Sequence, residues 1–244
     1  MPRLRIEVLM RRVFAVVIVF VAASAFAANT AKSVDSGSFG VFIGGKRVAT
    51  EKFDIQQRGD MNVALTELRT EDGSKGTQSG ELQLSLNGDL VRYTWKENGG
   101  DKAQAVVEPA HEFLVEHVSA GENKPHDTPF LLPHSTVILD DYSFAQRQIL
   151  AWRYLASVCS NEGGRLGCKG ERAQFGILIP QQQSAGSVYL TLKGKEKISI
   201  RGAERELNRI NLDTEDGQWA MWFDDNNKLV RILVAAANTE ILRD

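Results

Sequence analysis

Along most of this chain, apolar residues recur at every second position, in short runs separated by turn-forming residues. Side chains of an extended strand point alternately to its two faces, so a period of two is typical of strands with one buried face. The clearest runs are Phe39, Val41 and Ile43; Leu82, Leu84 and Leu86; Val91, Tyr93 and Trp95; Phe175, Ile177 and Ile179; Val188, Leu190 and Leu192; and Trp219, Met221 and Phe223. The pattern predicts a mainly β protein of about 11 to 13 strands.

Short turn signals join these runs and indicate that neighbouring strands are antiparallel. Gly44-Gly45 and Asn87-Gly88 favour tight hairpin turns, and residues 215–217 (Glu-Asp-Gly) turn the chain again. No Pro/Gly/Ser-rich linker, internal repeat or low-complexity tract divides the sequence. We therefore expect a single β-rich domain over residues 38–244.

Residues 139–155 break the alternation and indicate a helix. Asp140 or Asp141 is a suitable N-cap, and apolar residues then follow at helical spacing. The main stripe is Tyr142, Ala145, Ile149, Trp152 and Ala156, and a second set, Phe144, Ala151, Leu155 and Val158, widens it. A helix with so wide an apolar surface is mostly covered by protein. We predict a helix at about 141–158.

Strands on both sides of a single helix suggest one architecture. The expected fold class is mainly β (α+β), with a strongly curved antiparallel sheet or open barrel wrapped around the central helix. Trp152 should face the sheet, and Arg147 should lie on the polar side of the helix.

The first 27 residues have the features of a secretory signal peptide. Four arginines precede an apolar run over residues 13–23, and Ala25-Phe26-Ala27 supplies the small residues that a signal peptidase recognises. The run is shorter than the ~20 apolar residues of a membrane anchor, although an uncleaved membrane helix is the alternative. We expect cleavage near Ala27/Ala28, a flexible N-terminus over residues 28–37, no membrane span after cleavage, and a periplasmic or secreted protein.

Cleavage also changes the net charge. Residues 1–27 contain four arginines and one glutamate, so the formal net charge falls from −2 to −5 when they are removed. Nucleic acids and anionic membrane surfaces are bound chiefly through Lys and Arg. A mildly acidic chain without a long basic run is a poor candidate for either partner.

Cys159 and Cys168 are the only cysteines and flank a loop of eight residues. An oxidising compartment favours a disulfide between them. Closing a loop of about ten residues is worth roughly 2.5–3 kcal/mol in terms of chain entropy, so the bridge would be a local structural staple. The alternatives are a redox-active pair, which the missing C-x-x-C spacing disfavours, and two free buried thiols.

Three segments have features in common with a known family. Residues 39–52 contain a strand, a Gly-Gly turn and a second strand; residues 139–155 contain Leu-Asp-x-x-Ser before the helix; and residues 219–240 contain W-x-x-D followed by an apolar-Arg-Ile pattern. The chain thereby resembles a domain-of-unknown-function family of exported bacterial proteins with an open barrel like that of the lipoprotein carriers LolA and LolB. The resemblance implies fold and export; the family has no established activity.

The histidines do not match a known metal site. On a strand, His111 and His117 share one face while Glu112 and Glu116 project from the other, so the four side chains cannot converge. The glycines near position 44 lack the lysine-serine pair of a phosphate-binding loop. We predict no metal site and no cofactor.

The sequence also contains no recognisable catalytic motif. The chain has no G-x-S-x-G motif. Asp140 and Asp141 could act as an acid–base pair, but adjacent carboxylates at a helix start are more simply a cap and a dipole partner. We predict no catalytic residue.

Four aromatic side chains are candidates for a ligand-binding cleft between sheet and helix: Tyr93, Trp95, Trp152 and Trp219. Core packing is the other explanation for each of them. The leading hypothesis is an exported, non-catalytic protein that binds or scaffolds an apolar or amphipathic, lipid-like envelope component. The alternatives are an interaction module for another envelope protein, with a fully packed interior, and an envelope hydrolase with an unrecognised site.

Overall fold

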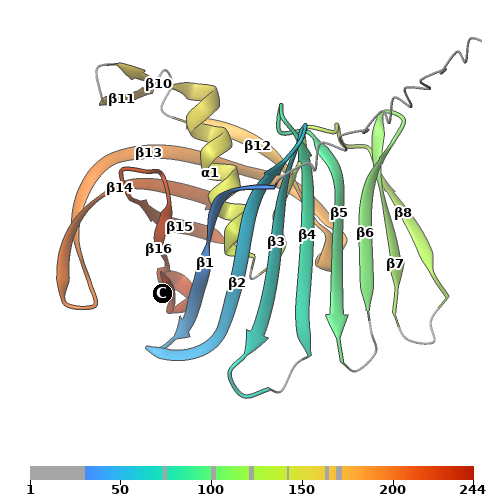
Figure 1. The fold of residues 1–244 in the computed structure, drawn as a ribbon, viewed down its shortest axis with the longest axis horizontal. Helices are drawn as coiled ribbons and strands as arrows, with labels where there is room; N and C mark the ends of the chain where they lie inside the picture. The colour runs from blue at the N-terminus through green and yellow to red at the C-terminus, as the bar shows by residue number, and fades with distance from the viewer. Residues whose placement is uncertain are drawn as a thin grey trace, which may run out of the picture.

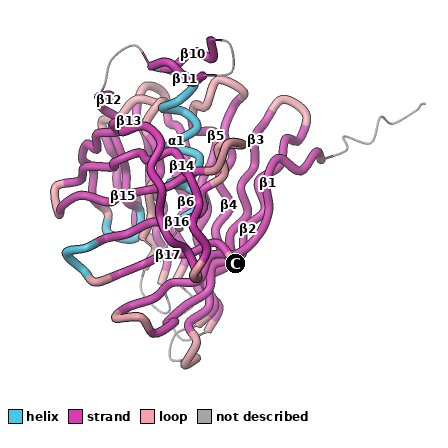
Figure 2. The backbone as a smooth tube through the Cα atoms, turned by 90° about the vertical axis from the view of Figure 1, so that its left-hand side faces the viewer, coloured by secondary structure: helices cyan, strands magenta, loops and turns pink. Residues whose placement is uncertain are grey.

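The computed structural model describes residues 31–73, 76–99, 103–120, 124–141, 143–162, 165–168 and 172–244. These residues form seventeen strands, one α-helix and two short 3-10 helices. Fifteen of the strands belong to one large sheet, which curves strongly around the helix (Figures 1 and 2). The predicted fold class, a curved antiparallel sheet wrapped around one helix, is confirmed.

The first half of the chain forms an antiparallel meander in which each strand pairs with its neighbours in sequence. Its strands are β1 (Lys32–Ile43), β2 (Lys46–Arg58), β3 (Met61–Thr70), β4 (Thr77–Ser85), β5 (Leu90–Asn98), β6 (Gln104–Ala110), β7 (Phe113–Ser119) and β8 (His126–Phe130). At two of its predicted turns, Gly44 and Gly88 have φ angles of 57° and 84°. Glycine adopts such angles without steric cost, which explains why the hairpins turn there.

The second half of the chain forms a similar meander. Its elements are β9 (Val137–Ile138), α1 (Phe144–Val158), β10 (Cys159–Glu162), β11 (Arg165–Cys168), β12 (Arg172–Ile179), η1 (Pro180–Gln182), β13 (Ser184–Ile200), β14 (Ala203–Thr214), β15 (Gly217–Phe223), β16 (Leu229–Val234), η2 (Ala235–Ala237) and β17 (Thr239–Arg243). β9 pairs in parallel with β12, and β10 and β11 form a separate hairpin. The predicted strand number was low because β8 to β11 are only two to five residues long and carry too few residues to show an alternation.

The two meanders meet where β1 pairs with β17. Phe39 lies opposite Arg243 and Val41 opposite Ile241 in this antiparallel pair. The sheet is therefore continuous, with β8 at one edge and β9 at the other. In Figure 1 the helix stands between the blue-to-green strands of the first meander and the orange-to-red strands of the second.

α1 fills the concave side of the sheet. It begins at Phe144, three residues after the predicted start, and ends at Val158, as predicted. Its most buried residues pack in one cluster with inward-facing residues of both meanders. The cluster includes Phe39, Leu114, Phe144, Leu150, Tyr154, Leu178, Leu190, Ile210, Leu212, Met221 and Phe223.

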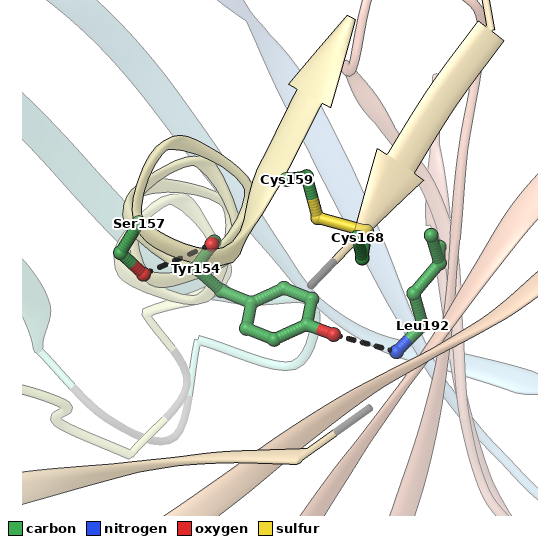
Figure 3. The surroundings of a disulfide bond; sticks show 5 residues. All are labelled: Tyr154, Ser157, Cys159, Cys168 and Leu192. Carbon is green, nitrogen blue, oxygen red and sulfur yellow. Dashed lines mark hydrogen bonds between the residues drawn. A yellow bond between two sulfur atoms is a disulfide. The ribbon is translucent and has the colours of Figure 1, made fainter. Parts of the chain in front are cut away.

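The buried face of α1 differs from the predicted one. Tyr154 has 0 % exposure, whereas Trp152 is half-buried and Ala156 is exposed. The hydroxyl oxygen of Tyr154 accepts a hydrogen bond from the backbone N–H of Leu192 in β13, at 2.9 Å (Figure 3). Two apolar stripes share this helix, so periodicity alone could not decide which stripe faces the sheet centre.

The start of α1 is capped by a side chain from β2. Glu51 accepts a hydrogen bond from the backbone N–H of Phe144 at 2.8 Å and one from the Ser143 hydroxyl at 3.4 Å. The predicted cap at Asp140 or Asp141 is therefore wrong. The N-cap position is Ser143, whose own side chain makes no capping hydrogen bond.

Three polar residues of α1, Gln146, Arg147 and Gln148, are buried as well. Arg147, predicted to lie on a polar side, is 4 % exposed and donates through Nη1 to the backbone oxygens of Asp140 and Ser143, at 2.7 and 2.8 Å. Gln148 accepts from the backbone N–H of Leu229 at 2.7 Å. The sheet covers this side of the helix, so these polar side chains bond to protein where those of a surface helix would face water.

Residues 32–37, predicted to be flexible, form the first part of β1. Asp35 anchors this part of the strand with ion pairs to Arg243 at 2.7 Å and Lys228 at 2.8 Å, and it accepts from Nε2 of Gln148 at 2.8 Å. Burial by itself would raise the pKa of Asp35, but the hydrogen bonds from these three partners hold it below its ordinary value. The prediction failed because these partners lie far away in sequence.

The predicted pairing of Cys159 with Cys168 is present as a disulfide. The two residues lie opposite each other in the β10–β11 hairpin, next to the C-terminal end of α1 (Figures 1 and 3). The hairpin lies outside the large sheet, so the bridge closes a local loop.

The predicted signal peptide, residues 1–27, lies outside the described residues. In the part of the chain that the structure describes, none of the helices has the length and hydropathy needed to cross a bilayer.

Candidate functional site

The four aromatic residues predicted to line a cleft lie in three places. Tyr93 and Trp95 of β5 share the concave face of the sheet, where both contact the core cluster. Trp219 of β15 lies under the guanidinium of Arg147, whose carbon is 4.6 Å from the ring centre. Trp152 donates its indole N–H to a backbone oxygen in the loop before β16, at 2.5 Å. Only Tyr93 and Trp95 can therefore belong to the same site.

Tyr93 is part of a buried hydrogen-bond network around Asp140. One oxygen of Asp140 accepts from the Tyr93 hydroxyl, and the other accepts from the backbone N–H of Gln181 in η1 at 3.1 Å. Burial raises the pKa of Asp140 to about 6. Burial and the neighbouring carboxylate of Asp140 raise the pKa of Tyr93 well above its usual value. Tyr93 therefore keeps its proton at neutral pH, and its hydroxyl donates a hydrogen bond to Asp140.

Glu51 and Arg147 form a second buried pair of titratable groups at the start of α1. Burial raises the pKa of Glu51 to about 8, against the opposing effects of its hydrogen bond from Phe144 and of the Arg147 charge. Burial also lowers the pKa of Arg147 to about 10, so the guanidinium remains protonated at neutral pH. Glu51 and Arg147 form hydrogen bonds with backbone groups of Asp140, Ser143 and Phe144. Both side chains therefore hold the start of α1 in place.

A cavity of about 610 Å³, large enough for a small ligand, lies on the concave side next to these networks. Strands β4 to β8 form one wall, and η1 with the following turn forms the other. Its lining residues are Gln78, Trp95, Glu97, Ala103, Gln104, Ala105, Glu116, Val118, His126, Pro180, Gln181, Gln182 and Gln183. We call it the Glu116 cavity.

Glu116 is the unusual residue of this wall. It is 0 % exposed, and neither carboxyl oxygen has a hydrogen-bond partner among the residues that the structure describes. On its two sides in the sheet it lies opposite Val107 of β6 and Thr128 of β8. Burial, with a smaller contribution from the charge of Asp140, raises the pKa of Glu116 to about 7. A carboxyl group kept in this state is more typical of a functional site than of a packed core.

Trp95 adds a second unsatisfied group to the same wall. Its indole N–H is buried and, within the described residues, has no acceptor. Trp95 lies opposite Ala105, and Ala105 lies opposite Val118 on the next strand, so small and apolar side chains separate the indole from β7. The Glu116 cavity thus combines an aromatic surface, an unused donor and an unused carboxyl group.

No protein-family model and no curated protein matches the chain. A beta-barrel-like protein of Brucella abortus is similar in structure. It belongs to a domain of unknown function, DUF1849; the two chains are 7 % identical, the match covers 86 % of this chain and 94 % of the other, and the TM-score is 0.49.

Two smaller cavities flank Arg147 and Trp219 at the start of α1. Their volumes are about 240 and 210 Å³, and both are also lined by Asp141. Arg147 already has Asp141, Glu51 and Asp140 as electrostatic partners. These cavities therefore surround a charge that is balanced within the protein, in contrast to Glu116.

The sequence patterns missed Glu116 because β7 is apolar on both faces. His117 lies on the outer face, where Nδ1 is 2.7 Å from Asp127 and Nε2 is 3.6 Å from Glu108. The predicted separation of His117 from Glu116 is confirmed. Glu116 could have been noticed from its spacing, because it lies on the same strand face as Leu114 and Val118 and is the charged residue between two apolar ones.

Proposed function

We propose that this protein is an exported, non-catalytic binding protein that holds an amphipathic envelope component in the Glu116 cavity. The observation that carries the proposal is the buried carboxyl group of Glu116, which has no partner among the described residues and lies in the wall of a 610 Å³ cavity. Leaving such a group unpaired costs about 1–3 kcal/mol. A ligand that supplies the missing partner recovers this free energy on binding.

The composition of the wall supports an amphipathic ligand. Trp95, Ala105, Val118 and Pro180 supply apolar surface, while five glutamine side chains and Glu116 supply polar groups. Ligand sites typically combine a mainly apolar lining with a few polar groups that fix orientation. The ligand would lie between strands β4 to β8 and η1. The space between α1 and the sheet is filled by large side chains such as Tyr154 and Leu150.

Two features support export as part of the proposal. The first 27 residues have the pattern of a cleavable signal peptide. The Cys159–Cys168 disulfide is typical of proteins that fold in an oxidising compartment. An envelope molecule would then be the natural class of ligand.

The binding function can be tested by recovering the bound molecule. Protein purified from the periplasm should carry a small molecule that native mass spectrometry and solvent extraction both detect. Val118→Trp places a large side chain in the Glu116 cavity and should abolish this co-purification. Val115→Trp, on the opposite face of the same strand, is the matched control and should retain the molecule. Wild-type protein without a co-purifying molecule, or equal retention by both variants, would contradict the proposal.

A further inference from the structure

The charged groups around the Glu116 cavity are of one sign. Its described lining contains two carboxyl groups, Glu97 of β5 and Glu116 of β7, and one histidine, His126 of β8, with no lysine or arginine. The side chains contributed by β4 and by Gln181–Gln183 are neutral amides. Asp140, from the loop before α1, adds negative charge at Glu116. Among the residues that the structure describes, no cation is therefore placed to balance this carboxyl group.

We propose that the ligand of this cavity carries a protonated amino group, which the carboxylate of Glu116 binds. The inference rests on the binding function proposed above and adds the chemical class of the ligand. An ammonium group supplies the opposite charge and donates hydrogen bonds to both unpartnered oxygens, and such charge-assisted bonds are about twice as strong as neutral ones. The indole face of Trp95, in the same wall, can provide further stabilisation of a cation.

Other head groups satisfy the wall less well. A carboxylate or phosphate would be repelled by Glu116 and by Asp140. A neutral hydroxyl could hydrogen-bond to protonated Glu116, but it would gain nothing from the surrounding negative charge. Of these head groups, only the ammonium group both donates hydrogen bonds to the unpaired oxygens of Glu116 and is attracted by the negative charge around them.

Binding of an ammonium group should release a proton from the protein. Glu116 has its pKa raised to about 7, so near this pH a large share of the ligand-free protein carries the proton. The ammonium group binds the carboxylate form, and the affinity should rise with pH until Glu116 is fully ionised. Below pH 7 the affinity should fall by about tenfold per pH unit, because the proton has to be removed first.

Contact with the carboxyl group requires a small movement of the wall. Glu116 has no exposed surface although it lines the cavity. A change of side-chain rotamer is enough to admit a head group, and such changes are common when ligands bind.

The test uses three probes with the same chain and different head groups: octylamine, octanol and octanoate. Isothermal titration calorimetry at pH 7, in two buffers that differ in ionisation enthalpy, measures the affinity and the number of protons released. Octylamine should bind at least about tenfold more tightly than octanol and release protons, whereas octanoate should bind most weakly. Glu116→Gln should lose the tenfold preference and the proton release while still binding octanol. Glu112→Gln, in the exposed turn before β7, is the control and should behave as wild type.

Each outcome separates this inference from the binding function. If octanol binds as tightly as octylamine, or if Glu116→Gln keeps the preference for octylamine, the ammonium class is wrong. The binding function then still stands on the co-purified molecule. If none of the probes binds, the ammonium inference is also overturned. Thermal melts check that Glu116→Gln is folded, which we expect because glutamine has the shape and neutrality of protonated Glu116.

Discussion

Three carboxyl groups on the concave side of the sheet, Glu51, Glu116 and Asp140, have pKa values raised mainly by burial. At the scale of single residues, these groups set the chemistry of the interior. Glu51 and Asp140 have partners that explain their retention in the fold. Glu116 is different, because the described residues provide it with no hydrogen bond and the nearby charge is repulsive.

The raised pKa values predict that the ligand-free protein is less stable at pH 8 than at pH 5. A carboxyl group with a raised pKa holds its proton more strongly when folded, so its stabilising effect is complete below the unfolded pKa and is lost as pH rises through the folded pKa. For Glu116 this window runs from 4.5 to about 7, and for Glu51 from 4.5 to about 8. Urea unfolding as a function of pH should show the decrease, and Glu116→Gln should remove about 2 kcal/mol of it. A flat profile in wild-type protein would show that neither carboxyl group is buried as described.

A second prediction concerns Glu51 as the cap of α1. Glu51→Leu removes the acceptor for Phe144 and Ser143 and should lower the free energy of unfolding by about 2–3 kcal/mol. Glu51→Gln keeps an acceptor oxygen and the neutral state, and should cost less than about 1 kcal/mol. Chemical denaturation at pH 7 distinguishes the two variants. Equal losses would mean that the charge of Glu51, and not its capping bond, stabilises the helix.

At the scale of elements, the strands could be predicted from sequence and the helix contacts could not. The alternation of Val91, Tyr93 and Trp95 and the turn at Asn87-Gly88 are local signals, because a strand and its turn are encoded within a few residues. The cap of α1 comes from Glu51, 93 residues before Phe144. No pattern in the helix itself could reveal that partner.

The candidate site was predictable only in part, for the same reason. Tyr93 and Trp95 share one face of β5, which a local alternation predicts, and Trp95 lines the Glu116 cavity. Trp152 and Trp219 lie elsewhere, because they come from elements whose relative position depends on the whole sheet. Glu116 was missed because both faces of β7 carry apolar residues.

The packing of α1 gives a prediction that tests which face is central. Tyr154→Ala should lower the free energy of unfolding by about 3–5 kcal/mol, because it empties a fully buried aromatic position. Ala156→Ser, on the exposed side of the same helix turn, should change it by less than about 0.5 kcal/mol. Thermal melts of the two variants provide the comparison. A larger loss for Ala156→Ser than for Tyr154→Ala would restore the originally predicted face.

At the scale of the whole molecule, the sheet consists of two meanders, and the first and last strands of the chain meet in its middle. β1 and β17 are adjacent in the sheet, whereas β8 and β9, which follow each other in sequence, lie at its two edges. The backbone N–H of Asp244 donates to the oxygen of Ser38 at 3.0 Å, so the C-terminal residue lies beside the middle of β1. Apart from this one junction, antiparallel neighbours in the sheet are also neighbours in sequence.

A circular permutant should therefore fold to the same structure, and faster. Residue Lys32 lies six residues before Ser38, a distance of about 20 Å along a strand, so a linker of about eight residues can join Asp244 to Lys32. New termini between Leu131 and Leu132 fall in an exposed segment; Leu131 is 92 % exposed. The permutant turns the pairing of β1 with β17 into a local contact, and lower contact order speeds folding. Stopped-flow refolding of both forms tests this, and a slower permutant would contradict it.

The same junction has a consequence for the order in which the strands become available while the chain is synthesised from its N-terminus. β1 is among the first strands to appear, yet the strand that covers one of its two edges, Thr239–Arg243, comes more than 190 residues later. Until then β1 can pair with β2 only, and its other edge offers free backbone groups beside the apolar side chains of Phe39 and Val41. Such an edge readily adds a foreign strand. We therefore expect the unfinished chain to be prone to aggregation at the uncovered edge of β1, and a chaperone that shields this edge to raise the yield of folded protein.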